Sequence, residues 1–152
     1  VELAVKVKNT LQELHEEAEI SVEALSGPGV EIAADYDLIE MALMNLMQNA
    51  VKYSQPPAKV RVKIEKSDVE VRIEVADQGI GISAEDLPRI FERFYRVDKA
   101  RSRKVGGSGL GLSIVETVIK KHYGRIDVQS EPGKGTTFVI TLPIRIITPG
   151  KA

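Results

Sequence analysis

The feature that most constrains the fold is a strict alternation of apolar and mainly charged residues between positions 59 and 75. Alternation with a period of two is typical of a β-strand with one buried face and one solvent-exposed face. The polar pair Ser67-Asp68 interrupts the pattern and predicts a turn. We therefore expect an antiparallel hairpin, whose alternating apolar residues are Val60, Val62, Ile64, Val69, Val71, Ile73 and Val75.

The other patterns predict helices and strands in mixed order. Apolar residues at helical spacing predict helices over 7–19, 84–94 and 108–123, and Asp35 is a candidate N-cap for a long helix ending near Tyr53. The apolar face of the first helix is expected to contain Val7, Leu11, Leu14 and Ala18. Short apolar runs predict strands over 20–25, 30–33, 124–130 and 136–142.

Neighbouring strands joined as hairpins favour an α+β fold, because a doubly wound parallel sheet needs a helix between most neighbouring strands. We expect a two-layer α/β sandwich, with a mixed, mainly antiparallel sheet and helices on one face. The 152 residues suit a single domain over 1–152. The chain has no cysteine and two histidines, which excludes disulfides, thiolate zinc sites and all-histidine metal cages. No stretch approaches the roughly 20 apolar residues of a membrane span, so no direct membrane insertion is expected.

Charge is distributed unevenly along the chain. Residues 1–54 carry 3 basic and 10 acidic side chains, whereas residues 55–152 carry 18 basic and 12 acidic ones. Seven of the basic residues lie between Arg89 and Lys104. The overall charge of -1 disfavours a nucleic-acid binder, which is usually basic throughout. The local basic segment fits either a small anionic ligand or an ordinary solvated surface.

The predicted helix that ends near Tyr53 has an unusual polar face. Asn45, Gln48, Asn49 and Lys52 follow the spacing i, i+3, i+4, i+7 and therefore share one side of the helix. An ordinary solvent face favours Glu, Lys and Arg, which form helices better than Asn does. Amide oxygens ending in a lysine suit a magnesium-bound phosphate chain. A plain solvent face is the alternative.

Eight of the twelve glycines gather in three clusters. Asp77 follows a predicted strand and precedes Gly79 and Gly81. Its carboxylate could accept a hydrogen bond from a ligand amino group, while the glycines let the backbone come close to that ligand. An ordinary turn is the alternative interpretation of this segment. Residues 106–112 form a glycine-rich entry to a helix, where free N–H groups and the helix dipole attract phosphate. Neither the dinucleotide pattern nor the P-loop pattern fits, since Leu112 and Gly135 occupy required positions. Residues 133–136 fit a hairpin turn or a ligand wall equally well.

Taken in order, these segments resemble the motifs of sensor histidine kinases. Residues 45–53 resemble the N box, 77–82 the G1 box, 90–96 the F box, 107–115 the G2 box and 133–136 the G3 region. The resemblance covers about 30–143, which is nearly the whole chain. It implies the sandwich fold of gyrase-type ATPases, heat-shock chaperones and mismatch-repair ATPases, with ATP and Mg²⁺ as cofactors under a mobile ATP lid over about 92–107.

The resemblance also implies residue roles. Asp77 would read the adenine amino group, Gly79 and Gly81 would let the base approach, and Asn49 would bind Mg²⁺, with Asn45 lining the same site. Arg96 and Arg93 would reach the terminal phosphate, and Phe91 and Phe94 would pack the base of the lid. Other contacts to nucleotide would come from Lys52, Tyr53, Ile82, Gly107, Ser108, Gly109, Leu110, Gly111, Leu112 and Thr136.

Asn45 separates possible activities. In the hydrolysing relatives, the residue four positions before the magnesium asparagine is a glutamate that activates water, and an amide cannot act as a general base. The resemblance therefore implies a protein histidine kinase, which transfers the γ-phosphoryl group of ATP to a histidine. A serine kinase of the anti-sigma-factor type and a non-catalytic nucleotide-binding regulatory module are the alternatives.

The acceptor histidine is not expected in this chain. His15-Glu16 resembles the start of the H box, but Glu17-Ala18-Glu19 follow in place of a basic residue and Pro-Leu. We expect His15 to be a surface helix residue and His122 to be structural or solvated. The resemblance implies that a separate dimerisation and phosphoacceptor domain, absent from this chain, is one partner and that a response-regulator receiver domain is another. It implies a cytoplasmic location and leaves membrane attachment of a parent protein open.

Overall fold

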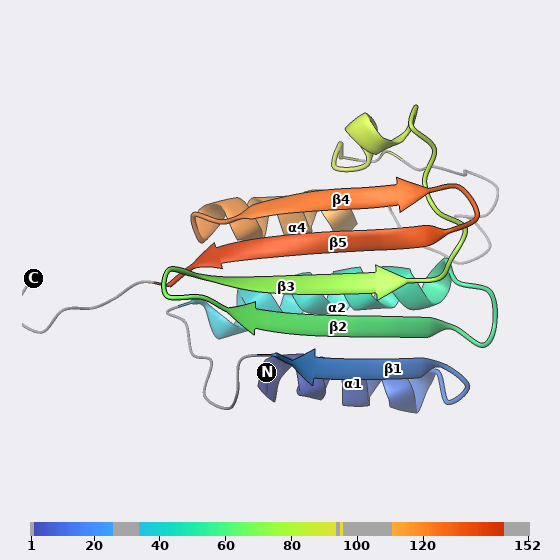
Figure 1. Ribbon diagram of the computed structural model, residues 1–152, viewed down its shortest axis with the longest axis horizontal. Helices are drawn as coiled ribbons and strands as arrows, with labels where there is room; N and C mark the ends of the chain where they lie inside the picture. The colour runs from blue at the N-terminus through green and yellow to red at the C-terminus, as the bar shows by residue number, and fades with distance from the viewer. Residues whose placement is uncertain (1, 26–33, 94, 96–110, 145–152) are drawn as a thin grey trace, which may run out of the picture.

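The computed structural model describes residues 2–25, 34–93, 95 and 111–144. Figure 1 shows a five-stranded sheet with helices α1, α2 and α4 packed on one side of it. The elements in chain order are α1 (Glu2–Leu14), β1 (Glu19–Ala24), α2 (Tyr36–Lys52), β2 (Lys59–Lys66), β3 (Glu70–Asp77), the 3-10 helix η1 (Leu87–Arg89), α4 (Gly111–Lys121), β4 (Arg125–Glu131) and β5 (Gly135–Pro143). The prediction of a two-layer α+β sandwich is confirmed.

The strand order is β1-β2-β3-β5-β4. The expected hairpins form, since β2 pairs antiparallel with β3 and β4 pairs antiparallel with β5. β3 also pairs antiparallel with β5, and β1 pairs parallel with β2, so the sheet is mixed and mainly antiparallel. This order places the end of β3 beside the start of β5, although about 60 residues separate them in sequence. Val69 lies in the turn before β3 and is 68% exposed, unlike the alternating residues that follow it.

Helix α2 begins and ends where the sequence predicts. The Asp35 side chain caps it, because Oδ1 accepts a hydrogen bond from the Leu38 N–H at 3.1 Å. Tyr53 is the C-cap, and its N–H donates to the Asn49 carbonyl. The buried face of the helix lies against the sheet and α4, which leaves its amide face at the side of the apolar layer. The buried residues are Ile39, Ala42, Leu43, Leu46, Met47, Ala50 and Val51.

The core lies between the helices and the sheet. The helix-facing side chains of the central strands form successive apolar rows, and α1, α2 and α4 cover them. Burial of this apolar surface is the main favourable term in folding. The row members are Val62, Val75, Phe138 and Val128, then Ile64, Ile73, Ile140 and Ile126, and finally Val71 and Leu142.

The first helix differs from its predicted bounds. α1 ends at Leu14, which is 68% exposed instead of lying on the apolar face, and Ala18 is buried in the following turn. The reason is a cap made by a side chain: the Gln12 amide donates to the carbonyls of His15 (3.2 Å) and Ala18 (2.6 Å). These bonds stabilise the turn that leads into β1, so the helix cannot continue to residue 19.

The helix predicted over 84–94 is wrong. Within the described residues, this segment consists of turns and the short η1. Pro88 provides the reason, because it has no N–H for a helical bond and its ring clashes with the preceding turn. Of the other predictions, the strand over 30–33 and the start of the last helix at 108–110 lie outside the described residues. No helix in the described part of the chain is long and apolar enough to cross a membrane.

Candidate functional site

One end of the helix-facing side of the sheet changes from apolar to polar. The rows described above are apolar, but the next row contains Asp77 on β3, Thr136 on β5 and Ser130 on β4. The first position of β5 is Gly135 and the last position of β3 is Asp77, so the row lies where these strands leave their ladder. A partly buried polar row beside a helix layer is a typical place for a ligand with both apolar and polar edges.

Asp77 is held in a fixed orientation by two backbone groups. Its Oδ1 accepts hydrogen bonds from the Gly79 N–H at 2.8 Å and the Thr136 N–H at 3.2 Å. No hydrogen bond to Oδ2 comes from the residues that the structure describes, so this oxygen can accept one from a ligand. Burial raises the pKa of the Asp77 carboxyl above its ordinary value, and the two N–H groups act in the opposite direction.

The glycines around Asp77 allow backbone segments to approach one another closely. A Cβ on Gly81 would lie 2.0 Å from the Glu131 carbonyl oxygen, and one on Gly135 would lie 2.1 Å from that of Asp77. Both glycines have positive φ, at 72° and 89°, which other residues rarely adopt. By contrast, a Cβ on Gly133 would meet nothing within 4 Å, so this glycine serves its turn through its φ of 78° alone.

The loop after β3 also contacts the end of α2. A Cβ on Gly79 would lie 2.5 Å from the Tyr53 carbonyl oxygen, and the Ile80 N–H donates to that oxygen at 3.2 Å. Asp77 is therefore placed next to the C-terminal end of the amide-bearing helix. The structure brings these two predicted motifs together.

The amide face of α2 also meets the start of α4. A Cβ on Gly111 would lie 3.3 Å from Asn45 Oδ1, while the Asn45 amide nitrogen donates to the Met41 carbonyl at 3.0 Å. Asn49 and Lys52 are half-buried. In the described part of the chain, the Asn49 side chain has no hydrogen bond and Lys52 has no ion pair, which leaves both able to bind a ligand.

The family follows from this arrangement and from comparison with known proteins. Residues 34–146 match the family described as "Histidine kinase-, DNA gyrase B-, and HSP90-like ATPase". The chain belongs to this ATPase family. The match begins just before the N-cap of α2 and ends just past β5, and it includes every predicted motif.

Individual relatives of this ATPase-family chain are sensor kinases. It is 45% identical over 129 residues to the sensor-like histidine kinase SenX3 of Mycobacterium tuberculosis, which covers 85% of this chain and 32% of the relative. It is 44% identical over 109 residues to the sensor protein SrrB of Staphylococcus aureus, which covers 72% of this chain and 19% of the relative. The chain thus spans about a third or less of the length of these relatives.

Solved structures agree with the family. The fold is similar to that of the mycobacterial sensor histidine kinase MprB, with a TM-score of 0.81 and 28% identity over 96% of this chain and 95% of that one. It is similar to the catalytic domain of histidine kinase ThkA in a nucleotide-free form, with a TM-score of 0.82 and 27% identity over 94% and 92% of the two chains. Both likenesses extend over nearly the whole domain.

The F-box segment of this ATPase-family chain is partly described. Phe91 packs edge-on against Phe138, with ring centroids 6.3 Å apart, so it belongs to the core and not to the polar row. The Tyr95 hydroxyl donates to Asp86, and this bond lowers the pKa of the Asp86 carboxyl. Arg93 is exposed, and Phe94 and Arg96 lie outside the described residues, as do Gly107, Ser108, Gly109 and Leu110. Leu112 and Ile82 are half-buried against the core.

The two histidines have different environments. His15 lies in the turn after α1, one residue past the helix end, and not in the helix as expected. His122 has a structural role, because its Nε2 accepts a hydrogen bond from the Asp35 N–H at 3.0 Å. Its Nδ1 lies 2.8 Å from the Val118 carbonyl oxygen and is therefore the protonated nitrogen. His122 links the end of α4 to the start of α2.

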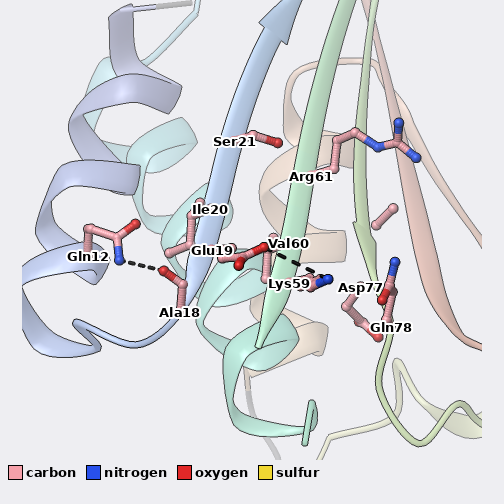
Figure 2. A pocket seen from close by; sticks show the side chains of 11 residues that line it. Gln12, Ala18, Glu19, Ile20, Ser21, Lys59, Val60, Arg61, Asp77 and Gln78 are labelled. Atoms are coloured by element: carbon pink, nitrogen blue, oxygen red, sulfur yellow. Dashed lines mark hydrogen bonds and ion pairs between the residues drawn. The ribbon is translucent and has the colours of Figure 1, made fainter. Parts of the chain in front are cut away.

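A groove of about 550 Å³ lies over β1, β2 and the end of β3 (Figure 2). Figure 2 shows the Glu19–Lys59 ion pair at 4.0 Å and the bond from Gln12 to Ala18 in its wall. Asp77 is among its described lining residues, but none comes from α2 or α4. The groove therefore does not contain the constellation of Asp77, Asn49 and Lys52.

Sequence reasoning missed Ser130. Its hydroxyl accepts from the Ile82 N–H at 2.7 Å, donates to the Gly135 carbonyl at 3.0 Å and lies 2.8 Å from Thr136 Oγ1. A signal was available, because Ile126 and Val128 occupy the preceding inward positions of β4 and Ser130 breaks that apolar series.

Proposed function

We propose that this chain binds Mg-ATP between the polar row of the sheet and helices α2 and α4, and transfers the γ-phosphoryl group to a histidine of a separate dimerisation domain. The phosphoryl group would then pass to an aspartate of a response-regulator receiver domain. The observation that carries this proposal is that two other motifs contact the amide-bearing helix α2. The loop after Asp77 contacts Tyr53 at the end of α2, and the start of α4 contacts Asn45.

The base would bind at the polar row. Asp77 Oδ2 is an acceptor that suits the amino group of adenine, and burial of the carboxylate strengthens such a charge-assisted bond. The flanking glycines let backbone segments pack closely around Asp77, since side chains at these positions would collide with backbone, and this packing fixes the position of the carboxylate. Ile82, half-buried against the core, offers apolar contact.

The phosphates would bind along α2. Lys52 lies in the last turn of the helix and Asn49 one turn earlier, so an ammonium and an amide oxygen face the same region. Mg²⁺ fits this donor set, because it prefers oxygen ligands and usually retains waters and phosphate oxygens. When bound, it would neutralise phosphate charge. In the described part of the chain, no group of three or more His, Asp or Glu side chains could hold a metal, which supports an amide-and-phosphate site.

Transfer in place of hydrolysis is supported by Asn45. Its amide nitrogen is committed to the Met41 carbonyl, and an amide cannot accept the proton of an attacking water. In the transfer, a histidine nitrogen would attack the γ-phosphorus, the bond to the ADP oxygen would break, and ADP would leave. The acceptor would come from a separate domain, because the residues that follow His15 do not match the H box and His122 is engaged with Asp35 and Val118. A phosphoryl donor such as ATP suits a cytoplasmic location.

The test is a transfer assay with γ-labelled ATP, Mg²⁺ and a phosphoacceptor domain of a sensor histidine kinase. We expect label on that domain that is lost in acid and kept in base, and no label on this chain alone. Acid-stable label would favour the serine-kinase alternative, and nucleotide binding without transfer would favour a regulatory module. An Asn49→Ala variant should lose most of the magnesium dependence of ATP binding, whereas Gln129→Ala, on the opposite face of the sheet, should retain it.

A further inference from the structure

We propose that Ser130 is a positioning residue of the nucleotide site, which joins three segments of the site through one hydroxyl and orients the Thr136 hydroxyl as an acceptor. This inference rests on the proposed nucleotide site. It concerns a residue that touches no proposed ligand group and acts through its neighbours.

The first step is the link that Ser130 forms between the loop after β3 and the β4–β5 hairpin. The Ile82 N–H, in the loop after β3, donates to Ser130 Oγ over 2.7 Å across 48 residues of sequence. The Gly133 N–H donates to the Ile80 carbonyl at 2.8 Å, and Gly81 packs against Glu131. These contacts clamp the loop onto the β4–β5 hairpin. Ser130 contributes its side-chain hydroxyl to this clamp, beside the bonds that backbone groups make.

The second step is to assign which hydrogen bonds the Ser130 hydroxyl donates and which it accepts. A serine hydroxyl has one proton and two lone pairs. A carbonyl oxygen can only accept, so the Ser130 proton is directed to Gly135 at 3.0 Å. The Ser130 lone pairs then accept from the Ile82 N–H and the Thr136 hydroxyl, which lies 2.8 Å away. The hydroxyl of Ser130 is therefore fully used.

The third step is the consequence for the ligand side. Because the Thr136 proton is committed to Ser130, the Thr136 hydroxyl can only accept from a ligand. Asp77 Oδ2, on the same row, is also an acceptor, and the Thr136 N–H fixes the other Asp77 oxygen at 3.2 Å. Two adjacent acceptors can take the two N–H protons of the adenine amino group, whereas guanine in the same orientation would present its carbonyl oxygen to both acceptors. Ser130 thus contributes to specificity without contacting the base.

The test compares Ser130→Ala with a matched control in the chain. Ser67 is the control, because its hydroxyl likewise accepts backbone N–H bonds, from Val69 and Glu70, at a turn at the far end of the sheet. We expect Ser130→Ala to weaken Mg-ATP binding about five- to tenfold, as the loss of one or two neutral hydrogen bonds would. Ser67→Ala should bind as the wild type does, and Ser130→Thr, which keeps the hydroxyl, should restore most of the affinity.

A second readout separates positioning from loss of stability. Titration with Mg-GTP should show that Ser130→Ala loses part of the preference for ATP over GTP, because the freed Thr136 proton can then donate to a carbonyl. Ser67→Ala should leave that preference unchanged. A third readout needs no variant that might fail to fold: in the wild-type chain without nucleotide, the Ile82 amide should exchange slowly with solvent, although it lies in a loop.

The inference is overturned if Ser130→Ala binds Mg-ATP with wild-type affinity, if Ser67→Ala loses as much affinity as Ser130→Ala, or if the Ile82 amide exchanges as fast as an open loop. These results differ from a failure of the proposed function. A wild-type chain that binds no ATP would contradict the nucleotide site itself. It would therefore also contradict the role of Ser130 in that site.

Discussion

Replacing Asp77 by asparagine is the perturbation that most sharply separates binding from folding. Asparagine keeps an oxygen that can accept from the Gly79 and Thr136 N–H groups, at 2.8 and 3.2 Å, so the loop retains its anchors. The other carboxylate oxygen becomes an NH₂ group, which donates where the carboxylate accepts. The base amino group would then face a donor instead of an anionic acceptor.

The expected loss of affinity follows from the bond that disappears. A hydrogen bond to a charged group contributes about 1.5–3 kcal/mol, so Asp77→Asn should weaken Mg-ATP binding roughly 10- to 150-fold. The upper part of this range is favoured because Asp77 is partly buried, where solvent screens the charge less.

Stability should change in the opposite direction. Burial raises the pKa of Asp77 in the folded chain above its unfolded value. A carboxyl raised in this way contributes stability that is fully present below the unfolded pKa and is lost as the pH rises through the folded pKa. Asparagine does not titrate. The unfolding free energy of Asp77→Asn relative to wild type should therefore be higher at neutral pH than at a pH below the ordinary carboxyl range.

Calorimetric titration with Mg-ATP and urea unfolding of the same samples measure both effects. Asp127→Asn is the matched control, because it removes the same charge from an exposed position on β4 without changing the polar row. Its ATP affinity should equal that of the wild type. The reasoning would be refuted by wild-type affinity in Asp77→Asn, or by equal losses in both variants.

Three other substitutions test the geometry by urea unfolding. Gly133→Ala should lower the free energy of unfolding by about 1–2 kcal/mol, because only its left-handed backbone is strained. Gly135→Ala should lower it by about 2–5 kcal/mol, because a Cβ 2.1 Å from the Asp77 carbonyl oxygen adds an overpacking penalty of about 1–3 kcal/mol. Equal costs would contradict the close packing described for Gly135. His122→Ala should destabilise the chain by about 1 kcal/mol, since it removes the hydrogen bond to the Asp35 N–H. An unchanged unfolding midpoint would show that this link between α4 and α2 does not contribute to stability.

Periodic features of the sequence predicted most of the fold. The strand alternation at 59–75 gave the β2–β3 hairpin because each inward position is buried against the same helix layer. The bounds of α2 were predictable because a local bond, from Leu38 to Asp35, determines its start. The predicted motifs also meet along α2, since the loop after Asp77 contacts Tyr53 and Gly111 contacts Asn45, which no local pattern could establish by itself.

Features that depend on distant contacts were not predictable. Helix α1 ends at Leu14 because the Gln12 amide reaches carbonyls in the next turn, and no sequence period records such a cap. The segment at 84–94 differs, because the reason for the wrong prediction is local: Pro88 within the segment prevents a helix despite the helical spacing. Ser130 acquires its role only through Ile82, which is 48 residues away.

The most direct test of the nucleotide site is a crystal structure of this chain with Mg²⁺ and the ATP analogue AMPPNP. We expect adenine beside Asp77 Oδ2 and Thr136, and phosphates and metal beside Asn49 and Lys52. A nucleotide seated instead in the groove between Glu19 and Arg61, or one whose base lies away from Asp77, would contradict it.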